Sequence, residues 1–100
     1  MKKSKKEVEN FLRRLKTWQL SEDASSIRRE YVMRDFAAAV AFINRIAKVA
    51  EKENHHPDLH LTGYRKLLIE LSTHEIGGLS EKDFALAAKI DKLPKRLKSA

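Results

Sequence analysis

Hydrophobic residues recur along this chain with two different periods, and each period predicts one kind of element. Apolar positions three and four residues apart predict helices over residues 4–16, 35–53 and 80–93. Apolar positions that alternate with polar ones predict strands over residues 17–20, 27–33, 59–64 and 66–73. The last of these strands should have two distinct faces, one with Leu67, Ile69, Leu71 and Thr73 and the other with Leu68, Glu70, Ser72 and His74.

Residues at the ends of the predicted helices support these boundaries. Ser4 with Glu7, and Ser80 with Asp83, have the spacing of a capping box, in which two side chains satisfy the first free amides of a helix. Pro94 lacks a backbone N–H and should end the last helix near residue 92 or 93. We therefore expect Asp83 to cap a helix, whatever else it does.

The predicted elements follow one another in the order α-β-β-α-β-β-α, with short connections. Strands that are joined directly pair antiparallel, and helices between such pairs pack against the sheet they leave. We therefore predict an α+β fold, a four-stranded antiparallel sheet with three helices packed on one face. One hundred residues suffice for one modest core, so residues 1–100 should form a single domain with its core over about residues 4–97.

Composition narrows the class of protein without identifying it. Apolar residues make up 42% of the chain and charged residues 35%, which is typical of a globular domain. The N-terminal lysines lead into acidic residues, and no apolar run is long enough to cross a bilayer, so we expect no membrane partner. The absence of cysteine excludes disulfide and thiolate chemistry and fits a reducing compartment, so the cytoplasm is the expected location.

The charge of the chain is strongly positive. Its 21 basic and 14 acidic residues give a formal net charge of +7, and much of the excess lies near the two ends. A basic surface can hold nucleic acid through the phosphates. Here the basic residues are not interleaved with stacking aromatic residues, and no nucleic-acid motif accompanies them. We interpret the charge as a solvated surface, with nucleic-acid binding as a less favoured alternative.

Histidines provide the candidate chemistry. His55 and His56 precede Pro57, and His74 follows the last predicted strand. Imidazole has the unperturbed pKa nearest neutrality, so these side chains can exchange protons with a substrate. Neighbouring side chains on an extended segment point in opposite directions, so His55 and His56 should have different roles. Zinc binding is a rival interpretation, although no carboxylate or cysteine lies at a usual ligand spacing from the pair.

Spacing gives a more specific indication than the histidines alone. Three residues separate Glu51 from His55-His56-Pro57, six separate Pro57 from Tyr64, nine separate Tyr64 from His74, and eight separate His74 from Asp83. In this pattern the chain resembles the pterin-4a-carbinolamine dehydratase family. The resemblance covers roughly residues 8 to 93, which is nearly the whole of the predicted domain.

The resemblance implies a reaction and a set of roles. Family members are lyases that dehydrate 4a-hydroxytetrahydrobiopterin to quinonoid dihydrobiopterin without a metal or organic cofactor, and so recycle the pterin used by aromatic amino-acid hydroxylases. The catalytic set would be His55, His56 and His74, with His55 and His74 as the acid/base pair and His56 mainly a substrate contact. The remaining residues implied are a pterin-binding rim of Asn54, Ser72, Thr73 and Glu75, and the supporting residues Glu51, Tyr64 and Asp83.

Two further expectations follow from the resemblance. Family members commonly carry an aspartate at the position of Asn54, which can still form hydrogen bonds but brings no charge. Family members are also dimers or tetramers, so a homodimer or homotetramer built through sheet edges and helices is implied.

A non-catalytic interaction role is the alternative function. Animal relatives also serve as dimerisation cofactors of a homeodomain transcription factor, and some bacterial relatives of this fold assist assembly of a carbon-fixing enzyme. Loss of the histidine set would favour such a role. This chain keeps the set, so the sequence favours the enzyme.

Overall fold

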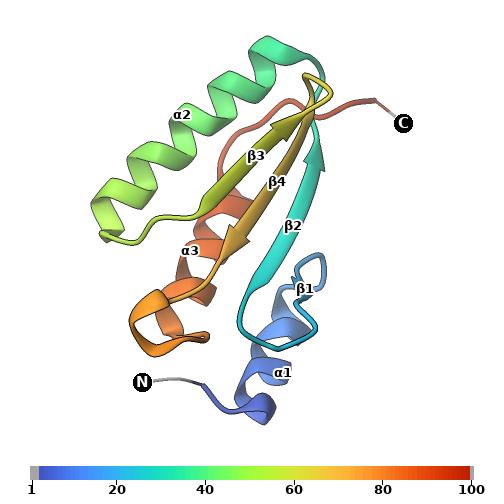
Figure 1. Ribbon diagram of the computed structural model, residues 1–100. Helices are drawn as coiled ribbons and strands as arrows, with labels where there is room; N and C mark the ends of the chain where they lie inside the picture. Colours follow the sequence, from blue (N-terminus) through green and yellow to red (C-terminus); the bar gives the residue numbers. More distant parts are fainter. Residues whose placement is uncertain (1–2, 100) are drawn as a thin grey trace.

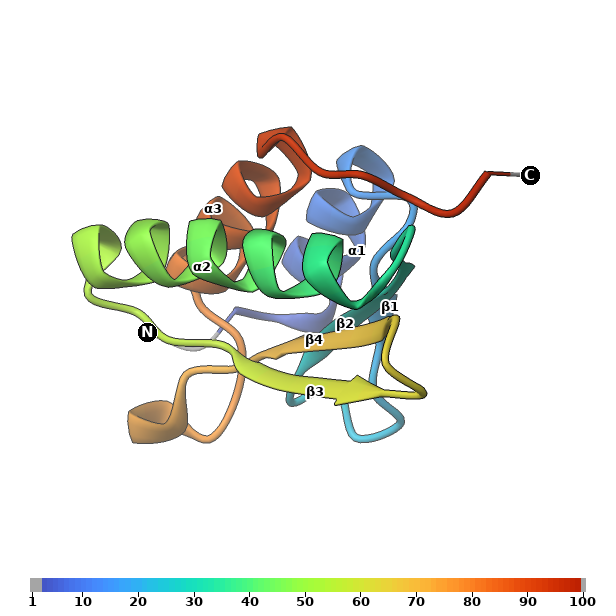
Figure 2. The ribbon, with the colours of Figure 1, turned by 90° about the horizontal axis from the view of Figure 1, so that it is seen from above.

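The computed structural model describes residues 3–99, and it has a four-stranded antiparallel sheet with helices along one face (Figure 1). The elements in chain order are α1 (Lys5–Arg14), β1 (Gln19–Leu20), β2 (Ile27–Val32), α2 (Phe36–Glu53), β3 (Asp58–Thr62), β4 (Lys66–Leu71), the 3-10 helix η1 (His74–Ile76) and α3 (Glu81–Lys92). Figure 2 shows that α1, α2 and α3 lie on the same side of the sheet. The predicted fold class and order of helices and strands are confirmed.

The sheet consists of two hairpins that meet in its middle. Its strand order is β1-β2-β4-β3, so β4 pairs with both β2 and β3. Ile27 pairs with Leu71 at one end of β4, and Asp58, the first residue of β3, pairs with Glu70. The segment that enters β3 and the segment that leaves β4 therefore lie at the same end of the sheet (Figure 1).

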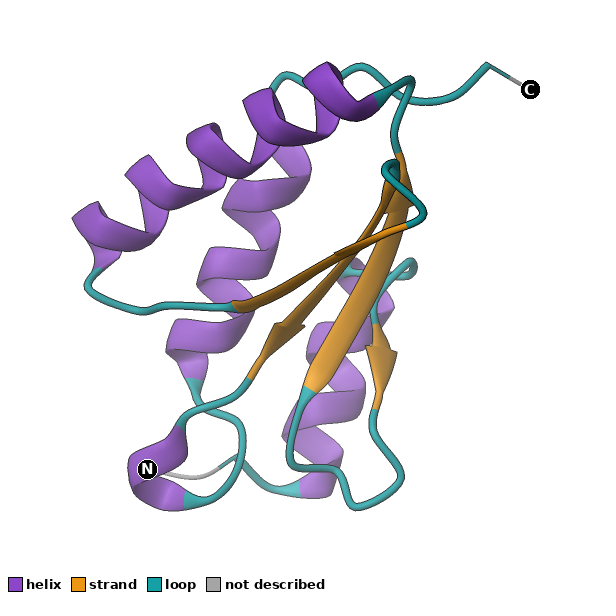
Figure 3. Cartoon of the chain, turned by 45° about the horizontal axis from the view of Figure 1, so that its top comes forward, coloured by secondary structure: helices purple, strands orange, loops and turns teal. Residues whose placement is uncertain are grey.

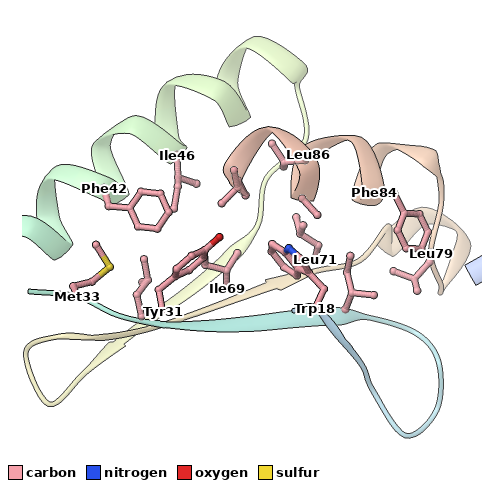
Figure 4. Packing of buried hydrophobic residues seen from close by; sticks show 14 of the residues in the cluster. Trp18, Tyr31, Met33, Phe42, Ile46, Ile69, Leu71, Leu79, Phe84 and Leu86 are labelled. Carbon is pink, nitrogen blue, oxygen red and sulfur yellow. The ribbon is translucent and has the colours of Figure 1, made fainter. Parts of the chain in front are cut away.

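The core fills the space between the sheet and the helices (Figure 4). Leu67, Ile69 and Leu71 of β4, which were predicted to share one face, are fully buried. Tyr31 of β2 meets the ring of Phe42 edge to face, with 5.1 Å between the ring centroids. Other buried apolar side chains come from the helices: Val8, Ile46, Phe84, Leu86 and Ile90. This shared core fixes the helices on the sheet and so fixes the relative positions of their ends.

A polar cluster around Asp91 lies at the margin of this core. Trp18 Nε1 donates to both carboxylate oxygens of Asp91, at 3.1 and 3.0 Å, and Arg29 lies 2.7 Å from one of them. Tyr31 also donates its hydroxyl to Asp91. Burial, helped by this hydrogen bond, raises the pKa of Tyr31, so its hydroxyl remains a donor. The ion pair with Asp91 thus explains why a charged residue, Arg29, lies on the inward face of β2 between the buried residues Ile27 and Tyr31.

The predicted helix ends agree with the observed caps. Both capping boxes are present, and the side chain of Asp35 accepts the N–H of Ala38 at 2.8 Å at the start of α2. Asn54 ends α2 in the left-handed conformation, and α3 ends at Lys92 before Pro94. None of the helices within residues 3–99 combines the length and the apolar character needed to cross a bilayer.

The predicted end of the last strand is wrong. β4 ends at Leu71, not at residue 73, because its ladder with β2 stops at Ile27 and its ladder with β3 stops at Asp58. The chain then turns into the short helix η1 (Figure 3), which spans His74–Ile76 and is capped by Gly77, where φ is 60°. Glycine suits this left-handed position because it has no Cβ to clash with the backbone.

Candidate active site

His55 leaves the end of α2 in a fixed position. Asn54 has φ 51° and ψ 42°, and its N–H returns to the carbonyls of Ala50 and Glu51. The N–H of His55 bonds to the carbonyl of Ala50 at 3.1 Å. This left-handed turn directs the chain back along the sheet toward β3, and it leaves the side chain of His55 only 12% exposed.

A buried carboxylate receives the ring of His55. Oδ1 of Asp83, which is fully buried in the first turn of α3, lies 2.6 Å from Nε2 of His55. The other oxygen, Oδ2, accepts the backbone N–H of Ser80 at 3.0 Å and the hydroxyl of Thr73 at 2.8 Å. A carboxylate only accepts hydrogen bonds, so Nε2 of His55 is the protonated nitrogen and Nδ1 is free when the ring is neutral.

Asp83 therefore serves the helix and the histidine with one carboxylate. The helix cap was predicted from the spacing to Ser80, and the family pattern predicted a supporting position. Three donors compensate the cost of burying its charge. Removal of the carboxylate would therefore affect both the start of α3 and the orientation of His55.

His74 reaches the same end of the sheet through Thr73. Continuing the register in which Asp58 faces Glu70 places His55 opposite Thr73, whose hydroxyl bonds to the carboxylate that holds His55. Thr73 is buried, whereas the neighbouring side chain of His74 is exposed at the start of η1. The two candidate acid/base residues thus come from adjacent segments that Asp83 links together.

His56 is turned away from Asp83. Its side chain is 58% exposed, and Nε2 contacts a carboxylate oxygen of Glu51, which is itself 75% exposed. A contact between two side chains this exposed contributes little to stability. Figure 1 shows the connection that carries both histidines between α2 and β3.

Two hollows flank Thr73, and the four candidate site residues of this segment, Ser72, Thr73, His74 and Glu75, each line one or the other. A hollow of about 330 Å³ is lined by Ser25, Ser72, Thr73, His74, Gly77 and Gly78. A second, of about 530 Å³, is lined by Lys3, Thr73, Glu75, Ile76, Ser80, Glu81 and Lys82. Asn54, His55 and His56 line neither. Ser25 and Lys3 were not predicted, because a serine in a turn and an N-terminal lysine carry no sequence signal of a site.

The structure does not bring Tyr64 to the histidines. Tyr64 lies in the turn between β3 and β4, with φ 56°, although the strand before it was predicted to include it. This turn is at the opposite end of the hairpin from His55, and the Tyr64 side chain is 57% exposed. Its hydroxyl accepts a hydrogen bond from Arg65 at 3.4 Å.

The arrangement is suited to proton transfer. An oriented imidazole with a carboxylate behind it stabilises the positive charge that forms when the ring takes a proton. A second imidazole, that of His74, lies on the adjacent segment and shares a hollow with Ser25, Ser72 and Thr73. Within residues 3–99 no three side chains of histidine, aspartate or glutamate gather as a set that could hold a metal ion.

Sequence comparisons place the chain among dehydratases. The family model described as pterin 4 alpha carbinolamine dehydratase matches residues 1–93. A mitochondrial pterin-4-alpha-carbinolamine dehydratase 2 from Arabidopsis thaliana is 42% identical over 88 residues, which cover 86% of this chain and 47% of that protein. A putative pterin-4-alpha-carbinolamine dehydratase from Halorhodospira halophila is 44% identical over 89 residues, which cover 89% of this chain and 81% of that protein. The chain thus spans about half of the plant relative and most of the bacterial one.

Solved structures agree on the fold. A transcriptional coactivator/pterin dehydratase from Brucella melitensis superposes with a TM-score of 0.85 at 31% identity, covering 91% of this chain and 96% of that one. A pterin dehydratase-like RuBisCO assembly factor of the alpha-carboxysome superposes with a TM-score of 0.63 at 21% identity, covering 75% of this chain and 86% of that one. The second likeness concerns the fold alone.

Proposed function

The chain belongs to the pterin 4 alpha carbinolamine dehydratase family, and on this basis we propose that it dehydrates 4a-hydroxytetrahydrobiopterin to quinonoid dihydrobiopterin. The observation that carries the proposal is the contact of His55 with the buried carboxylate of Asp83, which also binds Thr73 beside His74. In the proposed reaction, these two histidines, which are far apart in sequence, act on one substrate.

The reaction removes water from neighbouring atoms of the pterin. The bond between C4a and the hydroxyl oxygen breaks, N5 loses its proton, and a double bond forms between C4a and N5. We assign Nδ1 of His55 as the base for the N5 proton, because Asp83 stabilises the resulting imidazolium through Nε2. His74 then donates a proton to the departing hydroxyl, which leaves as water. Proton exchange with solvent restores both histidines.

The other residues of the site position the substrate in this proposal. His56, which contacts Glu51, binds the pterin, and Asn54, Ser72, Thr73 and Glu75 supply hydrogen bonds. Of these four residues, Ser72, Thr73 and Glu75 line the two hollows. No metal or organic cofactor takes part in the scheme. The product would return to an aromatic amino-acid hydroxylase as part of pterin recycling. We expect a cytoplasmic location, although the Arabidopsis relative is named as mitochondrial.

A dehydration assay tests the proposal directly. Synthetic 4a-hydroxytetrahydrobiopterin, mixed with the purified chain in a stopped-flow instrument, should lose water faster than in buffer alone, with a rate proportional to protein concentration. EDTA should leave the rate unchanged. A folded chain that gives no acceleration would contradict the assignment, and inactivation by EDTA that zinc reverses would support a metal site instead.

Exposed apolar residues support self-association through α2 and the sheet edge. Phe36 is 56% exposed and Val40 is 39% exposed, and these two residues lie one turn apart on the same face of α2. Beside α2, β3 is an edge strand whose outer backbone groups have no partner strand among residues 3–99. An apolar stripe next to an open edge is typical of an interface, so we propose a homodimer or homotetramer. The same surface would serve the alternative role of an interaction cofactor.

Val40→Glu should therefore convert the oligomer to a monomer. A buried carboxylate without a partner is costly, so light scattering coupled to gel filtration should give the monomer mass of 11.5 kDa for the variant and a multiple of it for the wild type. Ala85→Glu introduces the same charge at an exposed position of α3 and should leave the oligomer intact. A wild-type chain that is monomeric at micromolar concentration would contradict the proposal.

A further inference from the structure

A second concave site lies at the end of α2 away from the histidines. This site, the basic groove, has a volume of about 670 Å³ and lies between the first turns of α2 and the segment after α3. Figure 2 shows that C-terminal segment running past the start of α2. Along α2, Glu53 beside the histidines lies roughly 24 Å from Ala37 and roughly 12 Å from Arg45, the groove residue nearest to it in sequence. None of the residues that line the groove belongs to the candidate active site.

Positive charge dominates the walls of the basic groove. Arg34, Arg45, Lys95 and Arg96 line it, together with a single acidic residue, Asp35. The carboxylate of Asp35 is already engaged, because it caps α2 through Ala38 and lies 4.0 Å from Arg34. Among residues 3–99 no carboxylate forms an ion pair with Arg45 or Arg96. The groove therefore has an excess of positively charged side chains that acidic side chains do not neutralise.

The two walls of the groove are held by the fold. The N–H of Arg34 donates to the carbonyl of Arg96 at 2.9 Å, and the N–H of Lys98 donates to the carbonyl of Val32 at 2.9 Å. Lys95 donates to the backbone carbonyl of Asp91 at 2.8 Å, and its ammonium lies 5.2 Å from the ring centroid of Tyr31. Backbone hydrogen bonds thus fasten the C-terminal segment to the chain before α2, and they hold the two walls of the groove together.

The floor of the groove is small and apolar. Ala37 and Ala41 contribute it from one face of α2, and Pro94 lies on the opposite wall. Guanidinium groups bind phosphate oxygens in a bidentate manner, and alanine leaves room for a flat apolar body. Arg34 precedes α2 and Arg45 lies in its third turn, so the groove runs along the helix. The volume is in the range of small-molecule sites.

We propose that the basic groove binds an organic phosphate, with its phosphates on Arg45 and Arg96 and its apolar body on the alanine floor. Nucleotides and other phosphorylated metabolites share this chemistry. Binding here is separate from the dehydration of pterin, because the groove contains none of the residues assigned to that reaction.

Isothermal titration of the whole chain at about 0.15 M ionic strength tests this proposal. ATP and inorganic triphosphate should each saturate one site per chain, ATP the more tightly, while adenosine alone should not bind detectably. Equal affinity for ATP and triphosphate would show that the nucleoside contributes nothing to binding, and would overturn the proposal that the ligand is an organic phosphate. Absence of saturable binding by both would overturn it entirely.

Matched variants separate the groove from general charge attraction. Arg45→Gln with Arg96→Gln should weaken ATP binding by at least about tenfold, because each change removes a charge-assisted hydrogen bond. Lys5→Gln with Lys6→Gln removes the same charge from exposed positions of α1 and should change the affinity less than about twofold. Equal losses in the two variants would overturn the proposal.

Two further readouts complete the test. If the double variant does not fold, the single variant Arg45→Gln replaces it in the titration, because Arg45 is at an exposed position of α2. It too should bind ATP more weakly than the wild type. Affinity for oligothymidylate that rises steadily with length and exceeds that for ATP would instead assign the groove to nucleic acid. The titration measures binding and needs no catalytic turnover. A negative result in the dehydration assay would therefore not affect the conclusion about the basic groove.

Discussion

The single variants His55→Ala and His74→Ala should each have a kcat for dehydration that is about 10²–10⁴-fold lower than that of the wild type. His55→Ala removes the imidazole that Asp83 orients, and the reaction then has no positioned base for the N5 proton. His74→Ala removes the proposed acid and leaves the departing oxygen to be protonated by water. Stopped-flow dehydration at saturating substrate, with circular dichroism to establish that each variant is folded, measures both effects.

The remaining histidines provide the comparison. His60 is exposed on β3 and outside the spaced pattern, so His60→Ala should leave the rate within about twofold of wild type. His56→Ala should also cause a large loss, expressed more in KM if His56 mainly contacts the substrate. If kcat and kcat/KM were indifferent to changes at 55, 56 and 74 alike, the catalytic assignment would be wrong.

The helices, the strands and their buried faces could be predicted from the sequence because each depends on residues that are close together in the chain. Alternation in β4 predicted that Leu67, Ile69 and Leu71 share one face, and all three are fully buried in the structure. The pairs Ser4 with Glu7 and Ser80 with Asp83 begin helices as the capping-box spacing requires. Each of these features depends on residues a few positions apart, which a single sequence displays.

Features that depend on distant residues could not be predicted in this way. The contact between His55 and Asp83 joins residues 28 positions apart, and the spaced pattern indicated that both matter without indicating that they touch. Arg29 is a charged residue on the inward face of β2, and its partner Asp91 is 62 positions away in the sequence. The early end of β4, which places His74 on η1, results from the lengths of its neighbouring strands. Tertiary pairing decides all three.

Asp83→Asn should separate the two functions of this carboxylate. The amide has one accepting oxygen and one donating nitrogen, whereas Asp83 accepts from His55 on one side and from Ser80 and Thr73 on the other. The oxygen should face Ser80 and Thr73, because that orientation keeps two hydrogen bonds. The amide nitrogen then donates to Nε2 of His55, so the imidazole proton moves to Nδ1 and the base is lost.

We therefore expect kcat to fall by about 10²–10⁴-fold for Asp83→Asn, with a smaller loss of about 1–3 kcal/mol in the free energy of unfolding. Ser80→Ala is the matched control, because it weakens the cap by about 0.5–2 kcal/mol without touching His55. Urea unfolding and stopped-flow rates of both variants distinguish stability from positioning. The ¹⁵N shifts of His55 should report the change of tautomer in Asp83→Asn. Unaltered shifts and a rate within twofold of Ser80→Ala would reduce Asp83 to a helix cap, and His55 would then need another group to orient it.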